Sequence, residues 1–192
     1  MTSNDEIASL PRDIYPDMYW SSQEALISDL LSLISKFKDS LQLVVRMHPN
    51  LVNKQVLEQD RYAYLEDLQN VTLFHPDDCD INSYALAEIS DAVFVYCSTM
   101  GIESAYMCKH VYSMSPSYYD FLKVVEPIRS LQELSDTILH IASNDFRSFL
   151  GFEPNRRFRC NIFGNMQSSS GILYQFYSSL GRNHGTFLNV KF

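Results

Sequence analysis

The chain has 192 residues and a formal net charge of −8; 46% of its residues are hydrophobic and 13% are aromatic. This length and composition predict one globular domain with a core of ordinary size and exclude a disordered chain. The acidic balance argues against a broad surface that binds nucleic acid or an anionic membrane, although it leaves room for a local basic pocket.

The sequence shows no sign of export or of a membrane span. No apolar run approaches the roughly 18 residues that cross a bilayer, and the N-terminus has no basic-then-apolar signal pattern. The four cysteines, at positions 79, 97, 108 and 160, lack the paired spacing of a zinc or disulfide framework. We therefore expect reduced thiols, no metal, no cofactor and a location in the cytoplasm or peripherally at the inner face of the cytoplasmic membrane.

Short apolar runs alternate with segments of helical periodicity along most of the chain. Residues 1–19 contain Pro11 and Pro16 and are expected to form an irregular lead-in. Ser22 then stands where the N-cap of a first helix is expected. Helices are predicted at 23–38, 55–68, 82–89, 101–107 and 131–142. Strands are predicted at 41–46, 71–74, 92–96 and 110–113.

This alternation predicts an α/β fold, a Rossmann-like parallel sheet with helices on both faces and right-handed crossovers. The fold would occupy residues 20–143. Residues 144–192 would form an irregular or helical extension with a last helix at 172–180. Ligands of such sheets bind beyond the carboxyl ends of the strands. Polar clusters follow the predicted strands at 46–50, 75–78 and 97–103, so we expect all three at one edge.

The first cluster contains Arg46 and His48. Residues two apart share a face of an extended segment, so both side chains can point at one ligand. An arginine and a histidine N–H are suitable donors to a phosphate. The structural alternative is that Arg46 pairs with a neighbouring carboxylate and His48 caps a loop.

The second cluster is the turn at residues 97–103, which joins a buried strand to a helix. Hydroxyls and unpaired amides at the start of a helix attract anions, so a nucleotide is the first ligand hypothesis. Glu103 could then accept hydrogen bonds from the sugar hydroxyls of the nucleotide. Ordinary helix capping is the alternative for Ser98, Thr99 and Glu103. Capping does not account for Gly101, which would relieve steric hindrance where a phosphate approaches the backbone.

The third cluster contains His75, Asp77 and Asp78, residue types that serve in metal sites and in acid–base catalysis. Nothing in their spacing fixes a metal site, which needs several ligands in a defined geometry. A turn whose aspartates accept hydrogen bonds from local amides explains them better. We keep His75 and Asp77 as candidates for the catalytic base.

Three segments of the chain carry a family resemblance when they are taken together. They are 44–51 (VVRMHPNL), 70–77 (NVTLFHPD) and 92–105 (AVFVYCSTMGIESA). They resemble the C-terminal, nucleotide-sugar-binding half of GT-B glycosyltransferases that build bacterial capsules and surface polysaccharides. The order is similar too, with Arg-x-His-Pro after one strand and Ser-Thr-x-Gly-x-Glu two strands later. Similar pieces occur in capsular Kdo transferases and teichoic-acid polyglycerol-phosphate transferases, and the resemblance covers about residues 20–125.

The resemblance implies a role for each matching residue. The donor would be a CMP-, UDP-, GDP- or CDP-linked sugar, bound without a metal, and Glu103 would contact its ribose. Only about 20 residues precede the first predicted helix, whereas GT-B enzymes carry the acceptor site and usually the base in an N-terminal domain. We therefore expect turnover to need a second glycosyltransferase domain, a partner or a homo-oligomer. The implied contacts to the donor phosphate are Arg46, His48, Ser98, Thr99 and Gly101.

Two classes of function follow from these motifs. The first is the donor domain of a glycosyltransferase, which stabilises the leaving nucleotide phosphate electrostatically. The second is a non-catalytic nucleotide-sugar-binding or assembly module. A sugar-nucleotide epimerase-like and a polyglycerol-phosphate-transferase-like protein are further alternatives, and fold analogy alone does not choose among them. The chain lacks the glycine-rich dinucleotide fingerprint, the Walker A sequence and the Gly-x-Ser-x-Gly elbow. These absences disfavour a conventional dehydrogenase, an NTPase and a serine hydrolase.

Overall fold

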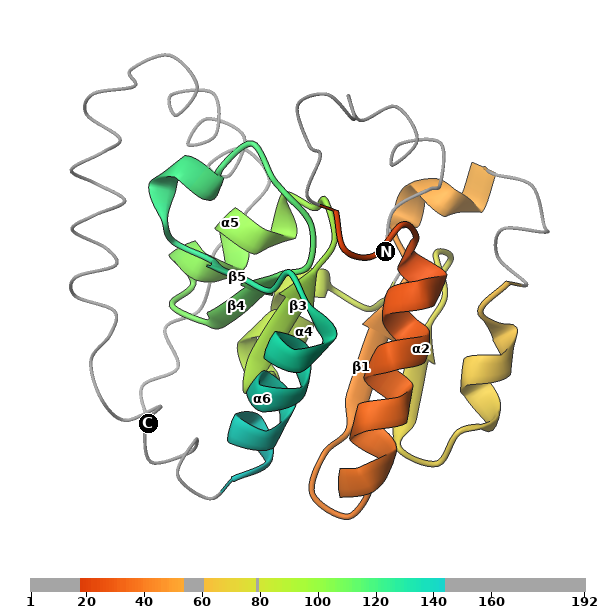
Figure 1. Cartoon of the computed structure of the whole chain (residues 1–192). Coiled ribbons are helices and arrows are strands. Elements are labelled where there is room, and N and C mark those ends of the chain that lie inside the picture. The colour runs from red at the N-terminus through yellow and green to blue at the C-terminus, as the bar shows by residue number, and fades with distance from the viewer. Residues whose placement is uncertain (1–17, 54–60, 79, 144–192) are drawn as a thin grey trace, which may run out of the picture. The chain divides into compact units, whose positions relative to one another are not determined.

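Parallel strands and helices alternate through the part of the chain that the computed structural model describes, residues 18–53, 61–78 and 80–143 (Figure 1). The chain divides into two units, 1–153 and 154–192, and all described residues belong to the first. The lead-in before residue 18 and the extension after residue 143, with its predicted helix at 172–180, lie outside the described residues. Among the residues described, no helix has both the length and the apolar character to cross a bilayer.

Within the described residues the strands form two hydrogen-bonded sheets, and each of their pairings is parallel. In the first sheet, β1 (Leu43–Arg46) pairs with β2 (Val71–Phe74). In the second, β3 (Ala92–Val95), β4 (His110–Ser113) and β5 (Glu126–Pro127) follow one another in that order. The predicted α/β class, Rossmann-like with parallel strands, is confirmed. The division into two sheets and the short strand β5 were not predicted.

The described residues form four α-helices and four short 3-10 helices besides the strands. The α-helices are α2 (Gln23–Ile34), α4 (Ser83–Ile89), α5 (Met100–Tyr106) and α6 (Leu131–Ala142). The 3-10 turns are η1 (Ser35–Phe37), η2 (Pro49–Asn53), η3 (Ala63–Asp67) and η4 (Asp120–Leu122). Four of the five helices predicted between residues 23 and 142 are thus found near their predicted bounds. The prediction at 55–68 was wrong for its described part, where a 3-10 turn at residues 63–67 stands in place of an α-helix.

Side chains at the N-caps explain where three helices begin. The Ser22 hydroxyl accepts a hydrogen bond from the Ala25 amide at 3.2 Å, and this confirms the predicted cap of α2. Ser130 caps α6 in the same way, and the Asn82 side chain caps α4. Each cap satisfies an amide that has no partner inside its own helix.

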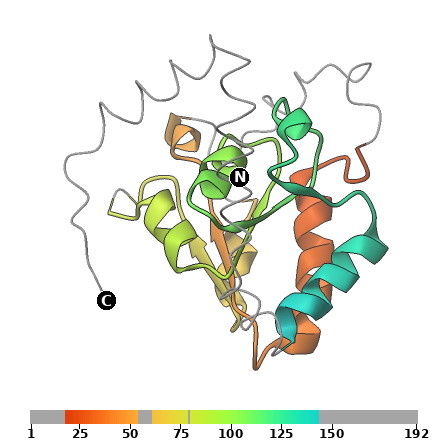
Figure 2. The ribbon, with the colours of Figure 1, turned by 90° about the vertical axis from the view of Figure 1, so that its left-hand side faces the viewer.

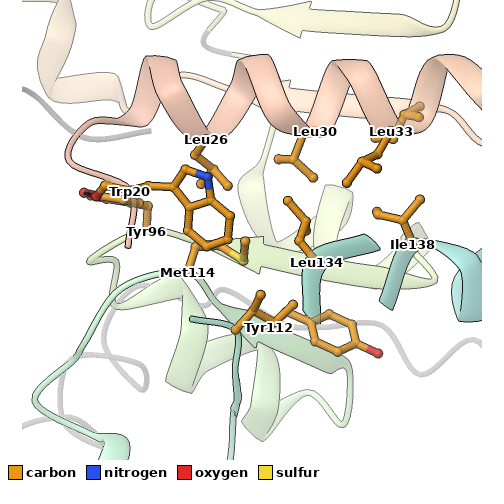
Figure 3. Packing of buried hydrophobic residues seen from close by; sticks show 11 residues of the cluster. Trp20, Leu26, Leu30, Leu33, Tyr96, Tyr112, Met114, Leu134 and Ile138 are labelled. Carbon is orange, nitrogen blue, oxygen red and sulfur yellow. Dashed lines mark hydrogen bonds between the residues drawn. The ribbon is translucent and has the colours of Figure 1, made fainter. Parts of the chain in front are cut away.

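Helices cover both faces of the strands, with α2 and α6 on one side and α4 and α5 on the other (Figure 2). The main core lies on the side of α2 and α6, where leucines of α2 meet α6 and the end of β4 (Figure 3). Alternation along β3 and β4 sends Phe94 and Tyr112 into this core, where their rings stack at 5.1 Å. The labelled members are Trp20, Leu26, Leu30, Leu33, Tyr96, Tyr112, Met114, Leu134 and Ile138.

The N-terminal half of α2 brings the carboxyl ends of β1 and β3 to the same end of the fold. The Tyr96 hydroxyl, directly after β3, donates a 2.7 Å hydrogen bond to the Trp20 carbonyl just before α2. Met47, directly after β1, belongs to a second buried cluster together with Ile27 of α2. Since both strands point toward the start of one helix, the segments that follow them share one edge, the carboxyl edge (Figures 1 and 2).

Candidate functional site

The turn between β3 and α5 has an unusual backbone that neighbouring residues hold in place. Cys97, a free cysteine, has a φ of 49°, in the left-handed region that non-glycine residues seldom adopt. Its amide donates to the Ser115 hydroxyl at 2.8 Å, which ties the turn to the end of β4. The Ser98 hydroxyl accepts from the Met100 amide at 3.3 Å, whereas the N-cap of α5 is Thr99, whose side chain makes no capping hydrogen bond. The Ser98 oxygen keeps its own proton to donate.

Glu103 lies one turn into α5 with a half-buried carboxylate. The hydroxyls of Tyr84, from α4, and of Thr99 donate hydrogen bonds to it. Burial raises the pKa of Glu103, while the two hydrogen bonds act in the opposite direction because they favour the charged form. A carboxylate has about four acceptor positions, so two hydroxyls leave capacity for the hydroxyls of a ligand.

Gly101 faces Tyr119, which lies in the loop after β4. A Cβ at Gly101 would stand 2.2 Å from the Tyr119 hydroxyl oxygen and 3.0 Å from a methyl of Val95. Real side-chain atoms do not approach so closely, so a larger residue at this position would have to displace the Tyr119 side chain. Tyr119 thus accounts for the glycine without any ligand, an explanation that the sequence pattern did not offer.

The loop after β4 is fastened on both sides. On one side the Tyr119 hydroxyl donates to the Ser98 carbonyl at 2.6 Å. On the other, Arg129, after β5, donates to the Ser113 carbonyl at 2.5 Å and lies 3.4 Å from the Asp120 carboxylate. The loop therefore forms a fixed wall beside the turn at residues 97–103.

Sequence reasoning missed this wall, although one signal marked it. The segment Ser115-Pro116-Ser117 directly follows the predicted strand at 110–113, as the three recognised clusters follow theirs. It was a fourth cluster at a strand end. The residues that the structure adds to the candidate site from this loop and from α4 are Tyr84, Tyr118, Tyr119 and Asp120.

Arg46 and the cluster after β2 form one hydrogen-bonded group. The Arg46 guanidinium donates to the carbonyls of His75 and Asp78, the latter at 3.3 Å. The Asp78 carboxylate accepts from the His75 amide at 2.6 Å, so the predicted turn with a local aspartate is confirmed. The His75 ring pairs with Glu66, and Asp77 is exposed. Arg46 thus supports this turn through two backbone carbonyls.

His48 follows β1 and is half-buried. Its carbonyl accepts from the Leu51 amide at 2.9 Å, which starts η2, so its backbone closes a loop. β1 ends at Arg46, so His48 lies beyond the strand whose alternation was expected to align the two side chains. Within residues 18–53, 61–78 and 80–143, no three His, Cys, Asp or Glu side chains form a group that could hold a metal ion.

Hydrogen bonds thus gather some of the predicted site residues into two groups that follow the ends of the strands. Arg46 joins the turn after β2, and Thr99 joins Glu103 at the start of α5.

No protein-family model matches the chain, and no curated protein or solved structure is significantly similar to it. Function is therefore inferred from the chemistry of the carboxyl edge and from the motifs of the sequence.

Proposed function

We propose that residues 20–143 bind a nucleotide-sugar as the donor half of a GT-B glycosyltransferase in bacterial surface polysaccharide synthesis. One observation carries the proposal. The segments after β1 and β3 both lie beside the N-terminal half of α2, so the Arg-x-His-Pro motif and the Ser-Thr-x-Gly-x-Glu turn follow strand ends at the same end of the fold. Ligands of parallel α/β sheets bind at the carboxyl ends of the strands. The proposal includes a location in the cytoplasm or at the inner face of its membrane, where such donors are used.

In this proposal each side chain has a role that its chemistry supports. The His48 ring N–H and the Ser98 hydroxyl donate to the donor phosphates, and the Thr99 hydroxyl would join them by exchanging its hydrogen bond to Glu103 for one to a phosphate. Glu103 accepts hydroxyls of the ribose, for which its half-buried carboxylate has capacity. As the sugar leaves, negative charge grows on the phosphate, and fixed donors lower the barrier by stabilising that charge. Arg46 is engaged with the turn after β2 and would add its positive charge without leaving that turn.

Transfer also needs an acceptor and a base within reacting distance of the donor. We propose that a second domain, a partner chain or a second copy supplies the acceptor site. His75 and Asp77 remain the candidates for a base in this chain, although Glu66 pairs with the His75 ring and Asp77 is exposed. A nucleotide-sugar-binding module without catalysis is the second candidate function. The residues proposed to bind the nucleotide-sugar include no established catalytic base, either around Arg46 or around Glu103.

Calorimetry on the full chain with CMP-, UDP-, GDP- and CDP-linked sugars tests binding. We expect one of these donors to bind and His48→Ala to weaken it roughly tenfold or more, the cost of a lost charge-assisted contact. His140→Ala is the matched control, because His140 is exposed in the last turn of α6. If folded protein binds none of the four donors, the proposal is wrong.

An assay with nucleotide sugars and an oligosaccharide acceptor then separates the two candidate functions. We expect the chain alone to give no useful transfer, and a domain or partner that supplies the acceptor site to produce transfer if the chain is a donor half. Robust product from the chain alone, abolished by Asp77→Ala or His75→Ala, would instead show a one-domain transferase that carries its own base.

A further inference from the structure

One residue of the candidate site has a strained backbone. Cys97, two residues after the end of β3, has a φ of 49°, a conformation that brings the Cβ of a non-glycine residue close to a backbone carbonyl. Such conformations persist only where the surrounding structure imposes them, and they are concentrated at functional sites. Cys97 comes immediately before Ser98 and Thr99, whose hydroxyls are proposed to donate to the phosphates. The conformation of Cys97 therefore decides where those two hydroxyls lie.

The loop after β4 holds the backbone on both sides of this strained position. The Cys97 amide donates to the Ser115 hydroxyl at 2.8 Å, and the Cys97 Sγ lies 2.9 Å from the same oxygen. One residue later, the Ser98 carbonyl accepts from the Tyr119 hydroxyl at 2.6 Å. Two side chains of one loop thus hold the first N–H and the last C=O of this two-residue segment. Of these two side chains, Ser115 is the one that bonds to the strained residue itself.

Ser115 is a buried and well-fixed support. Ser115 and Ser113, the last residue of β4, are both 0% exposed. The Ser113 hydroxyl donates to the Ser115 carbonyl at 2.6 Å, and the Ser113 carbonyl accepts from the Ile128 amide at 2.9 Å. Since Ile128 directly follows β5, the hydroxyl that holds Cys97 is connected to two strands of the sheet.

We infer that Ser115 is a positioning residue of the candidate site, which holds Cys97 in the left-handed conformation and thereby places the hydroxyls that follow it. The inference rests on the proposed nucleotide-sugar function and adds to it a residue that lies outside the three motifs. Ser115 does not itself contact the ligand but acts through Cys97. Donors that are already in place bind more tightly, because fewer groups have to be ordered when the ligand arrives. Loss of the Ser115 hydroxyl should therefore lower the affinity of the folded protein.

A purely structural role for Ser115 is the alternative that the test has to separate. A structural role lowers the free energy of unfolding and leaves the affinity of the folded protein unchanged. A positioning role lowers the affinity, and it depends on the strain at Cys97. The effect should therefore disappear when residue 97 can adopt the left-handed conformation without support. Glycine can do so, because it has no Cβ.

Calorimetric titration of the full chain with CMP-, UDP-, GDP- and CDP-linked sugars separates the two roles, with circular dichroism to verify that each variant is folded. We expect Ser115→Ala to weaken binding of the preferred donor roughly tenfold. Ser90→Ala is the matched control and should bind like the parent chain. The Ser90 hydroxyl also donates to a backbone carbonyl, that of Leu86 at 2.6 Å, but it lies before β3 rather than after it. In a Cys97→Gly background, Ser115→Ala should weaken binding less than about twofold.

Cys97→Val tests the strain from the other side and keeps the inference testable if Ser115→Ala does not fold. A β-branched residue rarely adopts a positive φ, so this variant opposes the left-handed conformation while Ser115 stays in place. We expect Cys97→Val to weaken binding of the same donor as well.

Each other outcome counts against a defined statement. If the parent chain binds a donor and Ser115→Ala binds it equally well, the positioning inference is wrong and the proposed donor function stands. The same loss from Ser115→Ala in the parent and in the Cys97→Gly background also overturns the inference, because strain at Cys97 would not be the cause. Binding by Cys97→Val at the parent affinity overturns it too. If the folded parent chain binds none of the four donors, the proposed function is overturned and the positioning inference with it.

Discussion

The Tyr119 hydroxyl donates a 2.6 Å hydrogen bond to the carbonyl of Ser98, which lies 21 positions earlier in the chain. This bond joins the loop after β4 to the turn after β3. The backbone position of Ser98 thus depends on a buried tyrosine outside the motif that contains it. The candidate site is therefore formed by the turn after β3 together with the loop after β4, and a substitution in one should alter the conformation of the other.

Gly101→Ala is expected to destabilise the fold through Tyr119. A new Cβ would lie 2.2 Å from the Tyr119 hydroxyl oxygen, and overpacking of this kind costs about 1–3 kcal/mol. Urea unfolding measures the loss. In a Tyr119→Phe background, which lacks the nearest atom, the cost of Gly101→Ala should fall. The same cost in both backgrounds would mean that Tyr119 is not the reason for the glycine.

Arg46→Met is expected to destabilise the fold even without a ligand. The guanidinium donates to two carbonyls of the turn after β2, and a lost hydrogen bond from a charged donor costs about 1.5–3 kcal/mol. Arg61→Met is the control, because Arg61 is 43% exposed and pairs with Glu24 at the surface. Such a pair contributes less than about 1 kcal/mol. Equal losses in the two variants, measured by urea unfolding, would remove the structural role assigned to Arg46.

The two aspartates after β2 should differ in the same assay. Asp78→Ala removes the acceptor of the His75 amide and should cost about 1 kcal/mol, whereas Asp78→Asn keeps an acceptor oxygen and should cost less. Asp77 is exposed, so Asp77→Ala should stay within about 0.5 kcal/mol of the parent chain. If Asp77→Ala is the more destabilising variant, the hydrogen bond from the His75 amide to Asp78 is not what stabilises this turn.

Much of the secondary structure was predictable because its causes are local. The cap at Ser22 and the periodicity of α6 are written in adjacent residues. The strand β5 has no such signal, since Glu126 and Pro127 are both exposed and the strand depends on β4 and on Arg129. Apolar periodicity identifies strands but not their hydrogen-bonded neighbours. The division into two sheets was therefore beyond it.

The candidate site divides in the same way between local and distant causes. Ser98, Thr99 and Glu103 were identifiable because one turn contains them all. Their partners Tyr84 and Tyr119 come from other elements, and only the fold brings them to the turn. The reason for Gly101 was also distant, and a pattern of neighbours could only suggest a ligand in its place.

The last prediction concerns the pH dependence of stability that Glu103 contributes. Burial raises its pKa in the folded protein above the ordinary value of 4.5. The folded state then holds the proton more tightly than the unfolded chain does. The stabilisation that results is fully present below pH 4.5 and is lost as the pH rises through the raised folded value.

Glu103→Gln cannot titrate, so it isolates this contribution. The free energy of unfolding of the parent chain, minus that of Glu103→Gln, should decrease as the pH rises from below 4.5 toward neutrality. Glu88→Gln removes the same charge from an exposed position of α4 and controls for net charge. A difference that grows with pH would mean that the hydroxyls of Tyr84 and Thr99 outweigh burial. Tyr84→Phe should steepen the decrease, because it removes one hydrogen bond that favours the ionised carboxylate.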